Sequence, residues 1–262
     1  MDFGLKEKTA VVMAASKGLG KAVARSLAAE GCRLAICSRN EAELENTANE
    51  IKQNTGSEII YRTVDVKNKS DIERFIRDTL KQYGTVDILV TNAGGPPVKS
   101  FEESTEEEWF EWYEITFMSV VRSVKAVLPT MKKNNFGRII HITSISVKAP
   151  VERLIYSNSL RLAVVGLAKS LANELGQYGI TVHNVAPGYH LTDGLERIIR
   201  KKIEAGAKRK NILEEWEQHI PLHKIGNPQD LAGIVTFLAS EQAGYLTGTT
   251  IQVDGGLYPG IL

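Results

Sequence analysis

Short apolar runs alternate with longer amphipathic stretches along this 262-residue chain, and that alternation limits the folds open to it. Continuous apolar runs of strand length predict strands buried on both faces. When helices separate such strands, the expected fold is α/β, with a parallel sheet covered by helices on both sides. The predicted strands are Thr9–Ala14, Arg33–Ser38, Glu58–Val64, Val86–Val90, Arg138–Thr143, Thr181–Val185 and Thr249–Val253. The predicted helices are Leu19–Glu30, Glu41–Asn54, Ser70–Tyr83, Glu106–Asn134, Ser157–Gln177 and Pro228–Ala239.

Helix-start signals support this assignment. A side-chain acceptor followed three residues later by Glu is typical of a capping box, and an Asn-Pro pair is typical of a first helical turn. No Gly-, Pro- or Ser-rich linker divides the chain, so one doubly wound domain over residues 1–262 is expected. The signals are Ser70-x-x-Glu73, Thr105-x-x-Glu108 and Asn227-Pro228.

One segment does not fit the alternation. Residues Leu191–His219 are long, charged and without a strand-like run. Because connections of this length are usually binding loops or lids, we expect a lid or substrate loop over about residues 189–219.

Charge and composition exclude several classes of protein. A net charge of +1 argues against a surface that binds polyanions, so no nucleic-acid partner is expected. Cys32 and Cys37 form no C-x-x-C pair and have no His cluster beside them, which favours a reduced cytoplasmic protein without a metal site. No apolar run reaches the ~18 residues of a membrane helix, so no membrane partner is expected.

A glycine-containing turn follows the first strand and opens the first helix. Gly18 and Gly20 allow a close approach of the backbone that a Cβ would block, and the helix start presents free N–H groups to a phosphate. We therefore expect this loop to bind the pyrophosphate of a dinucleotide. Its candidate residues are Ala14, Ser16, Lys17, Gly18, Leu19 and Gly20.

The end of the second strand predicts which dinucleotide is bound. An acidic residue there would accept a hydrogen bond from the ribose 2′-hydroxyl of NAD(H), but this chain has Ser38-Arg39. Arg39 offers a planar fork for a 2′-phosphate, and Lys17 adds a second cation. The alternative is that both are solvated surface cations. We expect NADP(H) to be preferred over NAD(H).

These motifs, with five more in the same order, resemble the short-chain dehydrogenase/reductase family, and in particular members of the 3-oxoacyl-ACP reductase and glucose dehydrogenase type. The resemblance implies a Rossmann-type domain with a seven-stranded parallel sheet. It also implies that the cofactor contacts Asp65, Val66, Asn92, Ala93, Gly94, Pro187, Gly188 and Thr192. The chain departs from the family at Met13-Ala14, where Thr-Gly is usual. The additional motifs are Asp65-Val66, Asn92-Ala93-Gly94, Pro187-Gly188 with Thr192, Gly226-x-Pro228 and Val253-Asp254-Gly255-Gly256.

The same resemblance implies how catalysis would work. In the family a Tyr donates a proton to the developing alkoxide, and a Lys one helical turn later lowers the Tyr pKa and holds the nicotinamide ribose. A Ser orients the substrate, and an Asn anchors a water. Ser144 fits the Ser position, and Thr116 stands where the Asn is expected.

The Tyr and Lys positions can be matched in two ways. Taking Tyr156 as the catalytic Tyr puts Leu160 at the Lys position and shifts the later Gly166 by one residue. Counting from Ser144 to Gly166 without a gap puts Ser157 at the Tyr position and Arg161 at the Lys position. We favour the second count, because one inserted residue would rotate the rest of a helix by about 100°. Arg161 would then face the nicotinamide ribose, with Tyr156 as a neighbour that could still reach the cleft.

Two histidines lie near these motifs, and one of them could also serve as an acid. His190 has a suitable unperturbed pKa for a substitute acid, although a rim position in the loop is the simpler interpretation. His141 lies inside a strand and is expected to be structural.

Two functions from different classes remain open. The first is an NADP(H)-dependent oxidoreductase that interconverts a ketone or aldehyde and an alcohol, with a sugar-like polyol or a 3-oxoacyl thioester as substrate. The second is an NADP-binding homologue with little or no turnover that acts as a sensor or assembly partner. The resemblance also implies a homotetramer or homodimer formed through the helices Glu106–Asn134 and Ser157–Gln177.

Overall fold

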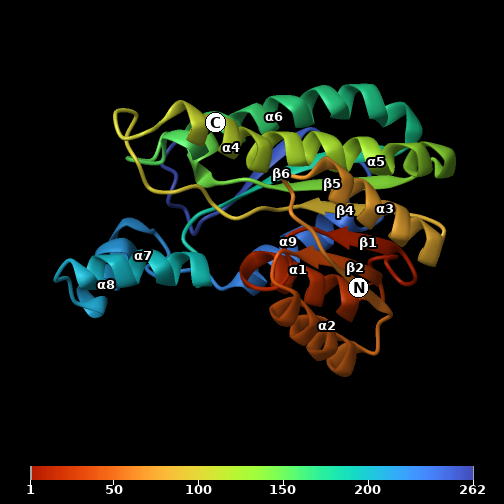
Figure 1. Ribbon diagram of the computed structural model, residues 1–262, viewed down its shortest axis with the longest axis horizontal. Coiled ribbons are helices and arrows are strands. Elements are labelled where there is room, and N and C mark those ends of the chain that lie inside the picture. The colour runs from red at the N-terminus through yellow and green to blue at the C-terminus, as the bar shows by residue number, and fades with distance from the viewer. Residues whose placement is uncertain (1, 262) are drawn as a thin grey trace.

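A computed structural model describes residues 2–261 and contains one sheet of seven parallel strands (Figure 1). The strand order is β3-β2-β1-β4-β5-β6-β7, and every neighbouring pair is parallel. All seven predicted strands are confirmed. Their bounds are β1 (Thr9–Val12), β2 (Arg33–Ser38), β3 (Ile59–Thr63), β4 (Ile88–Thr91), β5 (Gly137–Ile142), β6 (Ile180–Pro187) and β7 (Thr249–Val253).

Helices cover both faces of the sheet, each over its own apolar core, as predicted. On one face α1 (Gly18–Ala29), α2 (Glu41–Thr55) and α9 (Pro228–Ala239) pack on the strands. On the other face α3 (Lys69–Tyr83), α5 (Ser119–Asn134) and α6 (Ile155–Leu175) do the same (Figure 1). The strands are therefore buried on both sides, which explains their continuous apolar sequences.

The strand order places a topological switch point between β1 and β4, where open α/β sheets have a crevice. After β1 the chain builds the sheet outward through β2 and β3, and it then returns to place β4 on the other side of β1. Ligands of open α/β sheets bind outside the carboxyl ends of the strands at such a switch point. We therefore expect the ligand site to be formed by the segments that follow β1, β4, β5 and β6.

The predicted helix Glu106–Asn134 is not continuous. It consists of α4 (Glu106–Tyr113), a π-helical turn η1 (Glu114–Met118) and α5. Helical periodicity is present on both sides of the π turn, so the sequence predicted a single helix. Turns of this kind occur frequently at functional sites, and this one contains Thr116.

Two of the three predicted helix starts are confirmed. Thr105 and Glu108 form a reciprocal capping box, and Pro228 opens α9 after Asn227. The prediction for Ser70 was wrong, because α3 begins one residue earlier. The side chain of Asn68 caps it by accepting from the Ser70 N–H at 3.0 Å and the Ser70 hydroxyl at 2.8 Å.

The long charged segment forms two helices that project beyond the sheet, α7 (Asp193–Glu204) and α8 (Arg209–His219) (Figure 1). They enclose a small apolar cluster of their own, and Tyr189 stacks on Trp216 with ring centroids 5.0 Å apart. Within residues 2–261, no helix is both long and apolar enough to cross a bilayer. The cluster consists of Leu195, Ile199, Ile212, Trp216, Ile220 and Ile225.

Candidate active site at the carboxyl ends of the strands

The glycine loop closes tightly between β1 and α1. A Cβ on Gly20 would lie 2.4 Å from the carbonyl oxygen of Ala14, which excludes any other residue at this position without movement of the backbone. The Asn92 side chain, just after β4, donates to the same carbonyl oxygen at 3.4 Å. The predicted Gly loop and the Asn-Ala-Gly turn therefore meet at the crevice between β1 and β4.

Ala14 occupies the left-handed region of the backbone map, with φ = +50°. This conformation is strained for a residue with a Cβ, and glycine adopts it freely. Ala14, at a position where the resemblance led us to expect Gly, is therefore strained at the first turn of the loop.

The start of α1 is open to a ligand. Lys17 is its N-cap and makes no side-chain capping bond, and the first turn contains no acidic residue. The first N–H groups of a helix need partners from outside the helix, and a phosphate can supply them. Thr192 lies beside this point, since a Cβ on Gly18 would be 3.5 Å from its methyl group.

The segment after β6 reaches the same crevice. Thr192 caps α7 by accepting from the Leu195 N–H at 3.3 Å. Gly188 donates its N–H to the carbonyl of Val253 at 3.0 Å, and a Cβ on it would clash with Asp254 at 2.7 Å. The Pro187-Gly188 turn is thus hydrogen-bonded to the end of β7. Thr192 lies beside the glycine loop.

The residues proposed to read the ribose lie at the end of β2. Ser38 is buried and donates to the Asn40 carbonyl at 3.1 Å, whereas Arg39 is exposed and has no ion pair among residues 2–261. Lys17 is not free, because its ammonium group lies 3.0 Å from the Glu43 carboxylate. Glu43 was not identified from the sequence.

Asp65 and Val66 follow β3, as expected. Asp65 is bound locally, with its carboxylate accepting from the Lys67 N–H at 3.0 Å and its own N–H donating to Asp71 at 3.2 Å. Val66 is half-buried against the core under α3 and α5. These contacts fix the course of the backbone after β3, where a cofactor contact is expected.

Three serine hydroxyls gather where β5 ends and α6 begins. The Ser144 Oγ accepts from the Ser146 N–H at 3.1 Å, and the Ser146 hydroxyl bonds to the Ser157 hydroxyl at 2.9 Å. Ser146 and Ser157 are both buried. Ser146, a residue that the sequence analysis missed, therefore connects the two positions: its backbone N–H bonds Ser144 and its hydroxyl bonds Ser157.

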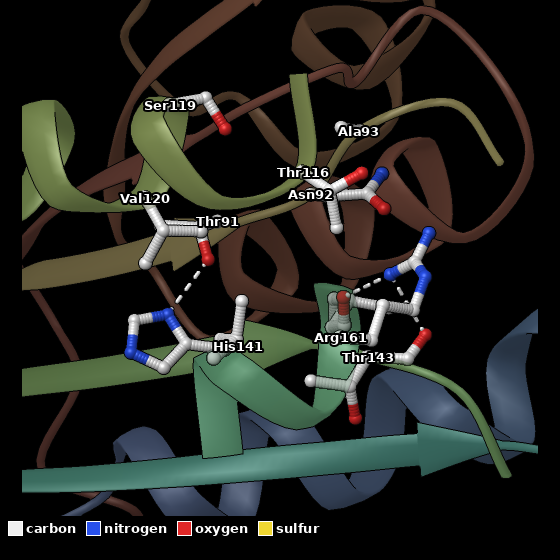
Figure 2. A pocket seen from close by; sticks show the side chains of 11 residues that line it. Thr91, Asn92, Ala93, Thr116, Ser119, Val120, His141, Thr143 and Arg161 are labelled. Atoms are coloured by element: carbon white, nitrogen blue, oxygen red, sulfur yellow. Dashed lines mark hydrogen bonds between the residues drawn. The ribbon is translucent and has the colours of Figure 1, made fainter. Parts of the chain in front are cut away.

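Arg161 reaches from α6 across the end of β5 (Figure 2). Its Nη1 donates to the carbonyl oxygens of Ile142 at 2.9 Å and Thr143 at 3.0 Å. No carboxylate pairs with it among residues 2–261, and burial lowers the pKa of its guanidinium to about 10. The side chain is therefore a buried cation whose bonds reach only neutral carbonyl groups.

Arg161 lines a small cavity that the sequence did not predict. The cavity holds about 20 Å³, which is room for one water. Leu160 is not part of its wall. The wall consists of Thr91, Asn92, Ala93, Thr116, Ser119, Val120, His141, Ile142, Thr143, Arg161 and Val164.

Tyr156 lies elsewhere. Its side chain is 0% exposed, its hydroxyl donates to Glu108 at 2.7 Å, and its ring packs edge-on against Trp109. Burial and the Glu108 carboxylate together raise the pKa of Tyr156. The other Glu108 oxygen binds Lys99 at 2.5 Å. The phenol is thus held by α4 and is not in the wall of the Arg161 cavity.

The two histidines have different positions. His141 faces the cavity and bonds through Nδ1 to the Thr91 hydroxyl at 2.7 Å (Figure 2). Burial and the nearby His183 lower the pKa of His141 to about 3, so it is neutral. His190 is also buried. Its ring lies against Gly226, its Nδ1 is 3.3 Å from the Gly188 carbonyl, and burial lowers its pKa.

Two of the missed residues had a local signal and one did not. Ser146 follows Ser144 by two residues, a spacing typical of a side chain that bonds a backbone N–H. Glu108 was recognised as a capping residue, but its bond to Tyr156 joins residues 48 positions apart. The Glu43 contact depends on how α1 and α2 pack, which no local pattern describes.

The chain is similar to known reductases over nearly its whole length. Residues 13–258 match the family described as enoyl-(acyl carrier protein) reductase. The 3-oxoacyl-[acyl-carrier-protein] reductase FabG of Haemophilus influenzae is 35% identical over 254 residues, covering 97% of this chain and 99% of the relative. Dehydrogenase/reductase SDR family member 4 of Sus scrofa is 34% identical over 253 residues, covering 96% and 88%.

Solved structures of reductases are also similar to this chain in fold. The L-sorbose reductase of Gluconobacter frateurii, solved with NADPH and L-sorbose, superposes with a TM-score of 0.96 at 29% identity over all of both chains. A variant of the actinorhodin polyketide ketoreductase, solved with NADPH, gives 0.91 at 31% identity over 96% of this chain and 97% of the other.

Proposed function

The chain belongs to the short-chain dehydrogenase/reductase family of oxidoreductases, and from that premise we propose that it interconverts a ketone or aldehyde and an alcohol with NADP(H). The observation that carries this proposal is the meeting of three features at one end of the sheet. They are the glycine loop at Gly20, the serine cluster at Ser144 and the buried cation Arg161.

The residues at the crevice fit a dinucleotide. The open start of α1 can bind the pyrophosphate, and the absence of a Cβ at Gly20 gives the loop its tight course. Asn92, Ala93 and Gly94 would line the nicotinamide side, with Pro187, Gly188 and Thr192 on the opposite wall. When bound, the nicotinamide supplies or accepts the hydride.

We propose that NADP(H) is preferred over NAD(H) because of the charge at the end of β2. Arg39 is an exposed cation without an ion pair in the described chain, and no acidic residue at the strand end would accept from a ribose 2′-hydroxyl. The similar L-sorbose and actinorhodin reductases were solved with NADPH, which supports the same choice.

In the proposed site Ser144 orients the substrate oxygen, and Ser157 donates a proton to it. The hydrogen bond between the hydroxyls of Ser157 and Ser146 supports this role, because Ser146 also bonds Ser144 and so holds Ser157 near it. Arg161 would hold the nicotinamide ribose and supply the positive charge of the family's Lys. Thr116, which shares the cavity with Arg161, would hold a water there. Tyr156 contributes through its contact with Glu108 and not through chemistry.

The substrate class follows from the relatives. One is named for the 3-oxoacyl group of acyl-carrier-protein thioesters, and a structural neighbour was solved with the ketose L-sorbose. We propose a sugar-like ketone or polyol, or a 3-oxoacyl thioester. Residues 189–219 would form the lid over this substrate, with α7 and α8 as its body.

The test is NADPH consumption over a panel of ketoses and 3-oxoacyl thioesters, with the wild type compared with Ser144→Ala, Arg161→Ala and Tyr156→Phe. We expect reduction of at least one class, a large loss in the first two variants, and a small change in the third. If none of the three variants alters a measurable rate, the site is misplaced.

A second function is favoured by one observation. The phenol of Tyr156 is bonded to Glu108, and Ser157 is a much weaker acid than a phenol. A homologue that binds NADP(H) without significant turnover, as a sensor or assembly partner, would need no acid. NADPH binding by fluorescence, with no carbonyl of the panel reduced, would support this alternative.

We also propose a homodimer or homotetramer built through α4, α5 and α6. Phe110 on α4 is 64% exposed and Leu162 on α6 is 51% exposed, and a partner chain packed on these helices would cover this apolar surface. Light scattering should give a multiple of the 28.9 kDa chain, and Leu162→Glu should lower it.

A further inference from the structure

The carboxylate of Glu43 contacts the glycine loop at two residues. One oxygen lies 3.0 Å from the Lys17 ammonium, and the other accepts from the Ser16 hydroxyl at 3.4 Å. Both partners belong to the loop expected to hold the cofactor phosphates. An acidic side chain therefore sits at the edge of a site whose ligand is an anion.

The position of Glu43 is fixed by the start of α2. The Asn40 side chain caps this helix by accepting from the Glu43 N–H at 3.1 Å. One turn later, Thr47 donates to the Ser16 carbonyl at 2.8 Å and ties the helix to the loop. The carboxylate is thus held against Lys17 by two anchored elements, so the contact does not depend on a chance orientation of two long side chains.

This arrangement affects a 2′-phosphate and a 2′-hydroxyl differently. Of the two cations available to a 2′-phosphate, Arg39 has no ion pair within residues 2–261, but Lys17 is already neutralised by Glu43. A phosphate that binds Lys17 must share the ammonium group with Glu43 or displace the carboxylate. Like charges at such short range repel, whereas a neutral 2′-hydroxyl meets no such penalty.

We propose that Glu43 is a specificity-determining residue that weakens the binding of NADP(H) relative to NAD(H). It makes the preference for NADP(H) smaller than Arg39 and Lys17 would give without it. The proposal rests on the proposed function only in that a nicotinamide nucleotide binds the glycine loop. It does not require that any carbonyl is reduced.

The chain provides a matched control for this effect. Lys21 and Glu50 form a second ion pair between the same two helices, with Nζ and Oε2 2.7 Å apart. The exposed fractions of the acidic partners are nearly equal, 41% for Glu43 and 42% for Glu50. Lys21 lies one helical turn beyond the loop, so Glu50→Gln removes an equivalent cross-link away from the phosphate site.

The experiment measures the dissociation constants of NADPH and NADH by fluorescence titration for the wild type, Glu43→Gln and Glu50→Gln. Glu43→Gln should bind NADPH about 3- to 10-fold more tightly and NADH within about twofold of the wild type. Glu50→Gln should change neither constant. Because the pair is partly exposed, the gain for NADPH should shrink when the ionic strength is raised.

Each outcome decides the proposal. An unchanged NADPH-to-NADH ratio in Glu43→Gln, or an equal change in Glu50→Gln, would overturn it. If the wild type binds neither cofactor, tight NADPH binding by Glu43→Gln would support it, and no binding would overturn it. Failure of the proposed function has a different signature, because the wild type would then reduce no carbonyl while these constants remain measurable.

Discussion

The Tyr156 hydroxyl lies 2.7 Å from the Glu108 carboxylate, and this bond joins the start of α6 to α4. The same carboxylate binds Lys99, in the loop after β4. Tyr156 thus links α6 to the loop after β4 through Glu108. Its hydrogen bond accounts for a polar group on a fully buried side chain.

Tyr156→Phe should therefore lower stability and leave catalysis largely intact. We expect a decrease in Tm of about 2–4 °C, since one hydrogen bond to a charged group is lost and its acceptor remains. The kcat/KM for reduction should stay within about threefold of the wild type. Glu108→Gln should lower Tm similarly. A loss of about a hundredfold in Tyr156→Phe alone would instead identify the phenol as the proton donor.

Arg161→Met should abolish most activity, because it removes the buried cation and both donors to the carbonyls of Ile142 and Thr143. We expect kcat/KM to fall by about 10²-fold or more, the typical range for loss of an electrostatic catalytic group. Leu160→Met is the matched control on the same turn of α6 and should retain activity. The reverse pattern would establish the first count of the motif, with Leu160 at the Lys position.

Arg39→Ala should weaken NADPH binding and spare NADH. The guanidinium is exposed and unpaired within the described chain, so its main loss is the contact to a 2′-phosphate. A weakening of about tenfold for NADPH is expected in fluorescence titrations, with NADH within about twofold. An equal loss for both cofactors would show that Arg39 supports the fold of the loop instead.

The buried His141 should make stability depend on pH below neutrality. Its folded pKa is lowered to about 3 from 6.5, so the unfolded chain binds the extra proton between these values. Stability is therefore complete above about pH 6.5 and falls as the pH is lowered toward 3, by about 1.4 kcal/mol per pH unit for this residue. His141→Asn should flatten that slope in urea unfolding at several pH values.

Two substitutions in the glycine loop should change the free energy of unfolding in opposite directions. Gly20→Ala should destabilise by about 2 kcal/mol or more, because the new Cβ would lie 2.4 Å from the Ala14 oxygen. Ala14→Gly should stabilise by about 0.5–1 kcal/mol through relief of its positive φ. Gly233→Ala, inside α9 with no atom within 4 Å of the added Cβ, is the control and should cause no loss. Urea unfolding compares the three.

The sheet could be predicted almost completely because its strands are buried on both faces and read as continuous apolar runs. Strands β2 and β7 match to the residue, and the ends of the other strands shift by at most two residues. The interruption of Glu106–Asn134 could not be predicted, since a π turn keeps the helical pattern on either side. The cap of α3 was misplaced because both Asn68 and Ser70 are good capping residues, and Asn68 forms the bond.

The candidate site was predictable only where motifs follow one another along the chain. The order of the Gly loop, the Asn-Ala-Gly turn and Ser144 located the crevice. The partners of individual side chains were not predictable, because Glu108 and Tyr156, or Lys17 and Glu43, are brought together by packing between helices. The sequence allowed two counts for the Tyr and Lys positions, and it could not give the contacts of Arg161 with the carbonyl oxygens of Ile142 and Thr143.

The separate apolar cluster under α7 and α8 has a consequence for how this protein could change. Trp216 and its neighbours pack mainly on one another and on Tyr189, away from the two cores that support the sheet. Mutations within this cluster would then leave the cores of the parallel sheet undisturbed. Substitutions in this cluster could therefore change the substrate specificity while the residues of the nucleotide site stay the same.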